Sequence, residues 1–216
     1  MIEAPNFRDL EWLDHGFGLR DSAAPADITT VKQIHSRIVI DVAEVKDGLK
    51  PEGDALISNQ PGVLVGMKTA DCVPILLVDT ANRAVAAIHA GWRGTAENIA
   101  ACTVQEMARR WNTRPENLRA AIGPSIGACC YEVGPEVLSR FDRWISTTAS
   151  TTGDRHLDLP AINEMQLRAE RVDDIWKSGE CTFCSAERFF SFRREREHAG
   201  RMLSFIGLQK YVGRTA

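Results

Sequence analysis

The sequence lacks the features that mark secreted, membrane-spanning and nucleic-acid-binding proteins. Residues 1–6 have neither the basic start nor the apolar run of a signal peptide, and no apolar run is long enough to cross a bilayer. The 26 basic and 29 acidic residues leave a net charge of −3, which offers no general attraction to nucleic acid or to an anionic membrane. We therefore expect a cytoplasmic monomer or homodimer that binds small molecules, without nucleic-acid or membrane partners.

Cysteine is present, but not in a pattern that predicts a disulfide framework or a zinc finger. Six cysteines in a chain of 216 residues without a secretion signal favour reduced thiols. Cys181 and Cys184 form a C-x-x-C pair, for which a zinc half-site or a redox pair is the alternative interpretation. No second C-x-x-C completes a four-sulfur site, and the adjacent Cys129 and Cys130 lie in a turn-rich stretch. We predict that all four are ordinary thiols.

Composition and periodicity favour one mixed domain over residues 1–216. Hydrophobic residues make up 44% of the chain and charged residues 25%, as in ordinary globular proteins. Apolar β-branched runs predict strands, two of them joined as a hairpin by a polar turn at residues 79–83, and amphipathic spacing predicts helices. Strands and helices mixed with antiparallel hairpins favour an α+β fold. The predicted strands are residues 31–42, 55–57, 63–68, 73–78, 84–89 and 120–123; the predicted helices are 95–111, with Thr95 as N-cap, 135–144 and 159–175; residues 146–155 are predicted to form a loop.

Three potential soft-metal ligands, His35, Cys72 and His89, are the most informative residues. Their spacing is too long for a zinc finger, so the fold would have to bring them together. Cys72 and His89 flank the predicted hairpin at adjacent strand ends, where both could reach one ion. Two imidazoles and one thiolate fill three corners of a tetrahedron, and catalytic zinc sites typically stop at three protein ligands. Taken singly, each residue is more often a buried histidine or thiol than a ligand.

The segments around these residues resemble the laccase-domain family, also called the multicopper polyphenol oxidase or purine nucleoside phosphorylase family. Collinear likeness covers most of the chain, which makes coincidence implausible. The resemblance implies a single domain with mixed, largely antiparallel sheets between helical layers, and a zinc ion on His35, Cys72 and His89. One departure is that only fourteen residues separate Arg20 from His35, where the family has a longer stretch. The matching segments are residues 17–20, 53–58, 67–77, 86–94, 121–134, 158–163 and 181–194.

The resemblance implies phosphorolysis of purine nucleosides such as adenosine, inosine and methylthioadenosine, with adenosine deamination as a side activity. Both reactions need a positioned oxygen nucleophile, which an open zinc site can activate. Phosphate needs cations, and arginine is its preferred partner. We predict substrate contacts for Arg20, Arg93, Arg193 and Arg194, each of which could instead form a structural ion pair. Asp71, beside Cys72, could orient a ligand or carry a proton, or it could cap a turn.

Three other functions remain open at this stage. Five histidines are too few for the four-copper cluster of a laccase within one subunit, although Cu²⁺ on the same three ligands is an alternative to Zn²⁺. Cys72 could act as a nucleophile with His89 as its base, and some members of the family are described as peptidoglycan editing factors, which implies hydrolysis of a cell-wall precursor amide. A non-catalytic metal-binding protein is the third alternative.

Overall fold

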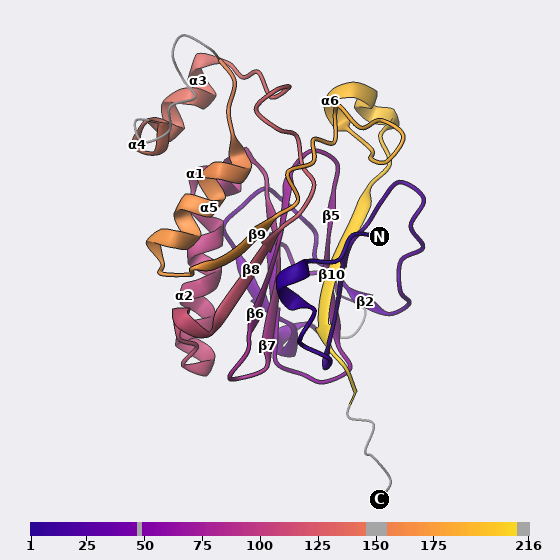
Figure 1. Ribbon diagram of the computed structural model, residues 1–216, viewed down its shortest axis with the longest axis vertical. Helices are drawn as coiled ribbons and strands as arrows, with labels where there is room; N and C mark the ends of the chain where they lie inside the picture. The colour runs from indigo at the N-terminus through magenta and orange to yellow at the C-terminus, as the bar shows by residue number, and fades with distance from the viewer. Residues whose placement is uncertain (47–48, 146–154, 211–216) are drawn as a thin grey trace, which may run out of the picture.

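The computed structural model describes residues 1–46, 49–145 and 155–210, which form two facing β-sheets with the longer helices gathered on one side (Figure 1). The predicted α+β class with mixed, largely antiparallel sheets is confirmed. Most of the predicted loop, residues 146–154, lies outside the described residues. No helix in the described part of the chain is long and apolar enough to cross a membrane.

The larger sheet has six strands and is built around the predicted hairpin, which is confirmed. Every residue of its two central strands is buried, because other parts of the protein pack on both faces of the sheet. They cover the apolar side chains that point to either face. Val78 pairs with Val85 near the turn, and Pro74 pairs with His89 at the far end. The strand order is β3 (Val39–Asp41), β4 (Ala55–Ser58), β7 (Ala84–Ala90), β6 (Val73–Asp79), β8 (Leu118–Ile122) and β9 (Asp174–Lys177).

The smaller sheet joins the two ends of the described chain. Strand β1 (Leu13–Phe17) pairs antiparallel with β10 (Met202–Leu208), which pairs antiparallel with β5 (Leu64–Thr69). The two-residue strand β2 (Ile28–Thr29) completes the edge in parallel with β5. Strands β1, β2 and β10 were not predicted from the sequence.

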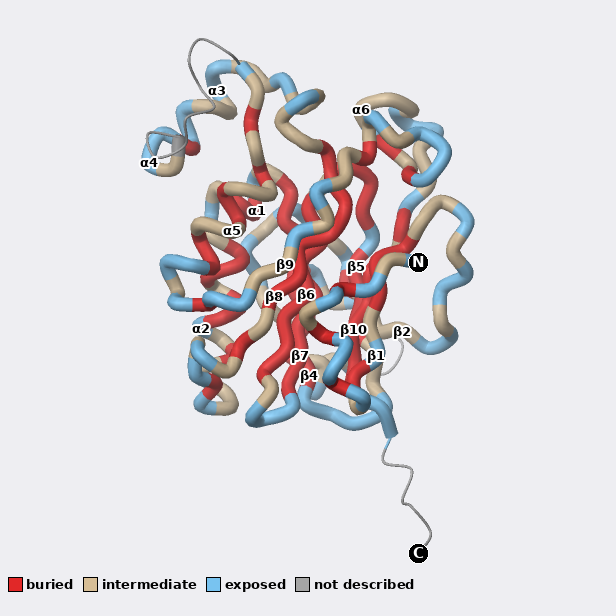
Figure 2. Tube along the Cα trace, viewed as in Figure 1, coloured by how far each residue is buried: buried red, intermediate tan, exposed pale blue. Residues whose placement is uncertain are grey.

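The core has two parts because successive strand residues point to opposite faces. Leu76 and Val78 of β6 face the smaller sheet, where they join the cluster that contains Val65 and Ile206. Ile75 and the other residues of its parity face α2 (Ile99–Trp111) and α5 (Leu159–Ala169). Figure 2 shows this arrangement as buried strands with exposed connections at the periphery.

The predicted helix over residues 95–111 is two helices. Helix α1 (Trp92–Ala96) ends before Asn98, whose left-handed φ of 60° separates it from α2. The prediction of Thr95 as N-cap is wrong: Thr95 is buried inside α1, and its hydroxyl accepts a hydrogen bond from Asn163. This contact ties α1 to α5.

Other boundaries also differ from the prediction. The predicted helix over residues 159–175 is α5 followed by strand β9, because Arg171 adopts φ 65° and turns the chain. The predicted strand over residues 31–42 is only β3, and the segment before it is a loop. Residues 135–145 form α3 (Pro135–Leu138), η4 (Ser139–Phe141) and α4 (Asp142–Ile145); the remaining short elements are η1 (Pro5–Phe7), η2 (Val42–Glu44), η3 (Pro115–Asn117), α6 (Phe192–Glu195) and η5 (Arg196–His198).

Candidate metal centre and active site

His35, Cys72 and His89 meet at one end of the larger sheet. Cys72 immediately precedes β6 and His89 lies near the end of β7, so the hairpin brings them together. His35 comes from the loop before β3. The ligand atoms of the three side chains all lie within 4.8 Å of one another, and Cys72 Sγ is 4.0 Å from His35 Nε2. Ligands of one tetrahedral zinc ion are separated by about 3.3–3.6 Å, so small side-chain movements suffice to close the site.

Asp54 holds both histidines in place. Its fully buried carboxylate accepts hydrogen bonds from the backbone N–H groups of Ile34, His35 and Ser36, and from the Ser36 hydroxyl. It also lies 2.8 Å from Nδ1 of His89, which fixes that ring and leaves Nε2 for a metal. Burial opposes the charge of Asp54, but donation from His89 and Ser36 prevails and lowers the pKa to about 2.

No role was predicted for Asp54, which lies within the family-like segment of residues 53–58. The available signal was an acidic residue directly before a short apolar strand, a position at which a carboxylate is costly to bury unless several donors satisfy it.

Gln33 anchors the loop that carries His35, and Gly91 leaves space for the His35 ring. The side-chain amide of Gln33 donates to the Lys68 carbonyl and accepts from the Lys68 N–H, which ties the loop to β5. A Cβ at Gly91 would lie 2.9 Å from Cδ2 of His35 and 3.0 Å from Sγ of Cys72. Glycine at this position therefore lets the two side chains approach the backbone closely.

Cys72 and His89 stabilise each other's charged forms. Burial raises the pKa of the Cys72 thiol, but the charge of His89 and hydrogen bonds from both histidines outweigh it, and the pKa falls to about 6. Burial lowers the pKa of His89, but Cys72 and Asp54 outweigh it and raise the pKa to about 9. The thiolate is the form that binds metals and acts as a nucleophile.

A cavity of about 610 Å³ opens onto the three ligands. Its lining is rich in cations and aromatic rings, and among the described residues that line it Asp71 is the one acidic residue. A positively charged, aromatic cavity suits an anion bound beside a flat ring. The cations are Lys68, Arg93, Arg193, Arg196 and Arg201, and the aromatic residues are Trp92, Tyr131 and Phe192.

The structure separates the four arginines predicted to contact substrate. Arg93 and Arg193 line the cavity. Arg93 stacks on Trp92 and, within the described residues, has no carboxylate partner, whereas Arg193 donates to the Glu132 carbonyl.

The other two arginines lie outside the cavity lining. Arg20 pairs with Glu195 and donates to the Phe189 carbonyl. Arg194 donates to the carbonyls of Thr182 and Phe183. Both therefore hold the segment around α6 in place.

Asp71 lines the cavity, but its carboxylate is committed to the segment around α6. One oxygen accepts from the Thr182 hydroxyl at 2.7 Å, and the other accepts from the Ser191 hydroxyl at 3.0 Å and the Arg193 N–H at 2.6 Å. Asp71 itself adopts φ 86° between β5 and β6. Its contacts hold the start of α6 and position Arg193.

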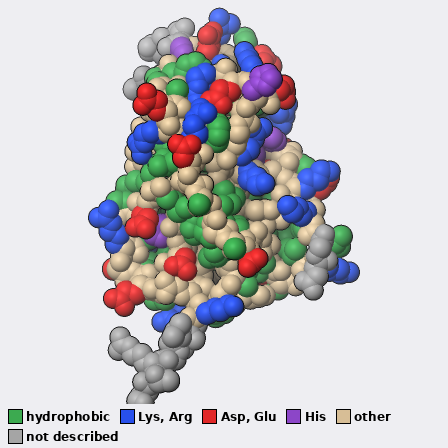
Figure 3. Space-filling view, turned by 90° about the vertical axis from the view of Figure 1, so that its right-hand side faces the viewer, with side chains coloured by type: hydrophobic (Ala, Val, Ile, Leu, Met, Phe, Trp, Pro, Cys, Tyr) green, Lys and Arg blue, Asp and Glu red, His purple; other side chains and the backbone are tan. Residues whose placement is uncertain are grey.

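One face of the molecule carries side chains of both charges. On the face shown in Figure 3, Lys and Arg side chains alternate with Asp and Glu side chains around a hydrophobic centre.

Comparisons with known proteins show the family and agree with the fold. The family described as multi-copper polyphenol oxidoreductase laccase matches residues 18–209. A purine nucleoside phosphorylase of Clostridium acetobutylicum is 39% identical over 203 residues, which cover 93% of this chain and 85% of the relative. A protein named adenosine deaminase RL5, from an unknown prokaryotic organism, is 39% identical over 85% of this chain and 75% of its own.

Solved structures are similar over most of the chain. YfiH of Bacillus licheniformis superposes with a TM-score of 0.81 and 28% identity, covering 92% of this chain and 94% of its own. YlmD of Geobacillus stearothermophilus superposes with a TM-score of 0.77 and 34% identity, covering 85% of this chain and 74% of its own.

Proposed function

The chain belongs to the multi-copper polyphenol oxidoreductase laccase family, and from this premise we propose that it is a zinc-dependent purine nucleoside phosphorylase with adenosine deaminase side activity. Adenosine, inosine or methylthioadenosine reacts with phosphate to give the free base and the pentose 1-phosphate. The observation that carries the proposal is that one cavity is lined by the three-ligand cluster, five cations and three aromatic rings.

The donor set fits zinc with an open position. Two imidazoles and a thiolate match a catalytic zinc site, and the cavity gives access to the fourth corner. When bound, zinc supplies a Lewis acid that polarises an oxygen ligand or makes it more acidic. The same donors also bind Cu²⁺, which remains the alternative metal.

Different side chains of the cavity bind the phosphate and the purine base. Arg93 and Arg193 offer guanidinium groups to phosphate, with further positive charge from Lys68. Trp92 and Tyr131 present flat surfaces on which a purine can stack. In this arrangement Asp71 positions Arg193 through the segment around α6 rather than carrying a proton.

A multi-copper oxidase cluster finds little support in the described part of the chain. The only clusters there with metal-binding geometry are the three-ligand site and a group of four cysteines. His15, for example, lies elsewhere, with its ring against Phe7. Oxidase activity with copper at the three-ligand site would be a secondary property.

The decisive experiment is adenosine turnover with and without phosphate, followed by chromatography, on protein of measured zinc content. Wild type should release adenine and ribose 1-phosphate only with phosphate, and inosine should form slowly without it. Cys72→Ala should abolish both reactions, while Cys102→Ser, which alters a cysteine of α2, should retain them. Zinc-loaded protein that leaves every nucleoside intact would refute the proposal.

A second candidate function rests on the Cys72–His89 pair. A thiolate held beside an imidazolium is an activated nucleophile, which suits hydrolysis of an amide such as that of a peptidoglycan precursor. Metal-free protein with full activity that alkylation of Cys72 abolishes would favour this hydrolase. Unchanged turnover of every substrate by His35→Ala would instead favour a non-catalytic metal-binding role.

A further inference from the structure

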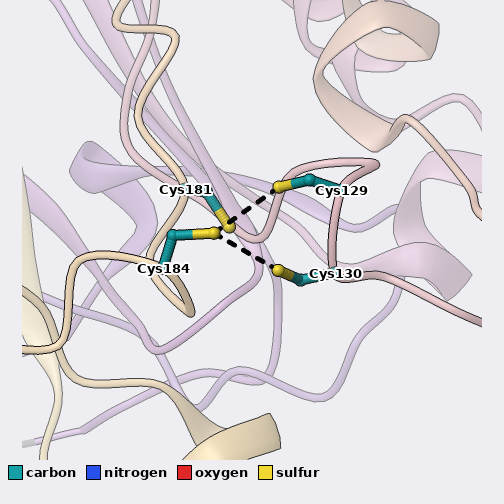
Figure 4. A group of neighbouring side chains, drawn as sticks. All are labelled: Cys129, Cys130, Cys181 and Cys184. Atoms are coloured by element: carbon teal, nitrogen blue, oxygen red, sulfur yellow. Dashed lines mark hydrogen bonds between the residues drawn. The ribbon is translucent and has the colours of Figure 1, made fainter.

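Two pairs of cysteines that are far apart in the sequence meet in a second cluster (Figure 4). Cys129 and Cys130 come from the loop after β8, and Cys181 and Cys184 come from the segment after β9. Cys184 Sγ lies 3.7 Å from Cys129 Sγ and 3.3 Å from Cys130 Sγ. All four sulfur atoms lie within 4.8 Å of one another. The adjacent Cys129 and Cys130 therefore supply the other two sulfurs of a four-sulfur site, although the sequence contains no second C-x-x-C motif.

These separations match the coordination sphere of a single ion. Four thiolates at about 2.3 Å from zinc in a tetrahedron lie about 3.8 Å apart. A disulfide would instead bring two sulfurs to about 2.05 Å, and the four cysteines are free thiols in this structure. Tetrahedral coordination by four sulfurs is typical of zinc or iron, and a closed set of four protein ligands is typical of a structural zinc site.

Backbone hydrogen bonds fold both cysteine-bearing segments into turns. The Gly127 N–H donates to Cys181 Sγ at 3.3 Å, which stabilises a thiolate at that position. The same glycine's carbonyl accepts from the N–H groups of Cys130 and Tyr131, so this loop is a tight turn. The second segment turns in the same way, with the Ser185 N–H donating to the Cys181 carbonyl.

We propose that Cys129, Cys130, Cys181 and Cys184 bind a structural Zn²⁺ ion, separate from the His35–Cys72–His89 centre. Four thiolates bind the ion through four Zn–S bonds, and the thiol protons are released to solvent as it binds. The proposal replaces our sequence-based prediction that the four cysteines are ordinary thiols. It does not depend on the proposed function.

The ion would join two walls of the cavity. Cys130 directly precedes Tyr131, which lines the cavity, and the segment from Cys181 continues to Arg193. In protein without the ion, the contacts that bridge these walls include the Ser125–Cys181 bridge and the hydrogen bonds from Arg193 to the Glu132 carbonyl. The tetrathiolate site therefore positions the aromatic and cationic sides of the cavity relative to each other.

Zinc stoichiometry of protein purified under reducing conditions tests the proposal. Wild type and the matched cysteine control Cys102→Ser should each bind two zinc ions per chain, one for each ligand cluster. Cys72→Ala and Cys184→Ser should each lose one, and the double variant should lose both. Failure of the proposed phosphorylase would leave these counts unchanged, so the two proposals can fail separately.

X-ray absorption at the zinc edge provides a measurement that leaves the four cysteines intact. In zinc-loaded Cys72→Ala, the ion should have four sulfur neighbours at about 2.3 Å. Mixed nitrogen and sulfur coordination in this variant, one zinc ion in wild type that Cys184→Ser retains, or a Cys130–Cys184 disulfide in freshly purified reduced protein would each overturn the proposal.

Discussion

The carboxylate of Asp54 lies 2.8 Å from Nδ1 of His89 and accepts the backbone N–H of His35 at 3.0 Å. One buried charge therefore orients the ring of one candidate ligand directly and positions another through its backbone. The candidate metal centre therefore depends on a residue outside the three-ligand set, as expected for a carboxylate that orients a histidine ligand.

Replacing Asp54 with Asn should weaken zinc binding at the three-ligand centre by about 10–100-fold, the range typical for loss of such an orienting group. The amide keeps one acceptor oxygen, but its NH₂ group faces the N–H donors of residues 34–36. Competition with a chelator measures the affinity.

The matched control for Asp54→Asn is Asp79→Asn. Asp79 is also fully buried and accepts N–H donors of a turn, but it lies at the opposite end of β6. The Asp79→Asn variant should be less stable than wild type but should bind zinc with wild-type affinity. Equal affinity in the two variants would contradict the role assigned to Asp54.

Gly91→Ala should reduce zinc affinity while leaving the metal-free protein nearly as stable as wild type. Gly91 has φ −70°, which alanine adopts readily, so the backbone is not strained. The added methyl group instead meets His35 and Cys72 at about 3 Å and pushes the ligands apart. Chelator competition and chemical denaturation of the metal-free proteins separate the two effects. Wild-type zinc affinity in Gly91→Ala would contradict this prediction, because it would show that His35 and Cys72 can move aside without weakening zinc binding.

Arg93→Met should raise the KM for phosphate far more than the KM for adenosine. A lost charge-assisted hydrogen bond costs about 1.5–3 kcal/mol, which corresponds to about 10–100-fold in kcat/KM for phosphate. Arg109→Met, on the exposed surface of α2 and paired with Glu106, is the control and should leave both constants unchanged. Equal effects on phosphate and adenosine would place Arg93 outside the phosphate site.

Asp71→Asn should raise the KM for phosphate and retain zinc, while the pH profile of kcat/KM keeps its shape. This follows because the carboxylate is bonded to Thr182, Ser191 and the Arg193 N–H and acts through the position of Arg193. A proton carrier would behave differently: kcat would fall by about 100-fold or more and one limb of the profile would disappear. Steady-state kinetics between pH 5 and pH 9 distinguish the two roles.

The central hairpin could be predicted because its information is local. Residues 73–78 and 84–89 are continuous apolar runs separated by a short polar turn, and the pairing places Cys72 beside His89. The third ligand was identified from its surrounding sequence, but its backbone was assigned to a strand. His35 lies in a loop at φ 60°, held by Asp54, and that contact spans nineteen residues that carry no periodic signal.

Long-range pairing explains what the sequence did not reveal. Strands β1 and β10 pair across nearly the whole chain, so neither shows its partner in local patterning. The four cysteines illustrate the same limit, because C-C and C-x-x-C spacing gives no reason to associate segments more than fifty residues apart. Among the four predicted arginines, sequence context could not distinguish those lining the cavity from those bonded to the segment around α6.

His15 should make the protein less stable as the pH falls below about 6.5. Burial lowers the pKa of His15 in the folded state, and Nε2 accepts the Ala4 N–H at 2.9 Å, which requires the neutral ring. The unfolded chain therefore binds a proton that the folded chain resists, so the free energy of unfolding falls from the unfolded pKa, about 6.5, towards the lower folded pKa. Above that window the ring is neutral in both states and contributes no pH dependence.

Urea denaturation of wild type and His15→Gln at several pH values isolates this contribution. Glutamine offers an acceptor for the Ala4 N–H without titrating, so the pH dependence of its unfolding free energy should be shallower by up to about 1.4 kcal/mol per pH unit below pH 6.5. Zinc loss at low pH should affect both proteins alike and cancel in the difference, because His15 contacts Phe7 and Ala4 and belongs to neither group of candidate metal ligands. If the unfolding free energies of the two proteins changed in parallel with pH, the prediction would be wrong. His15 would then be protonated in the folded protein as easily as in the unfolded chain, and loss of the Ala4 N–H hydrogen bond would not affect stability.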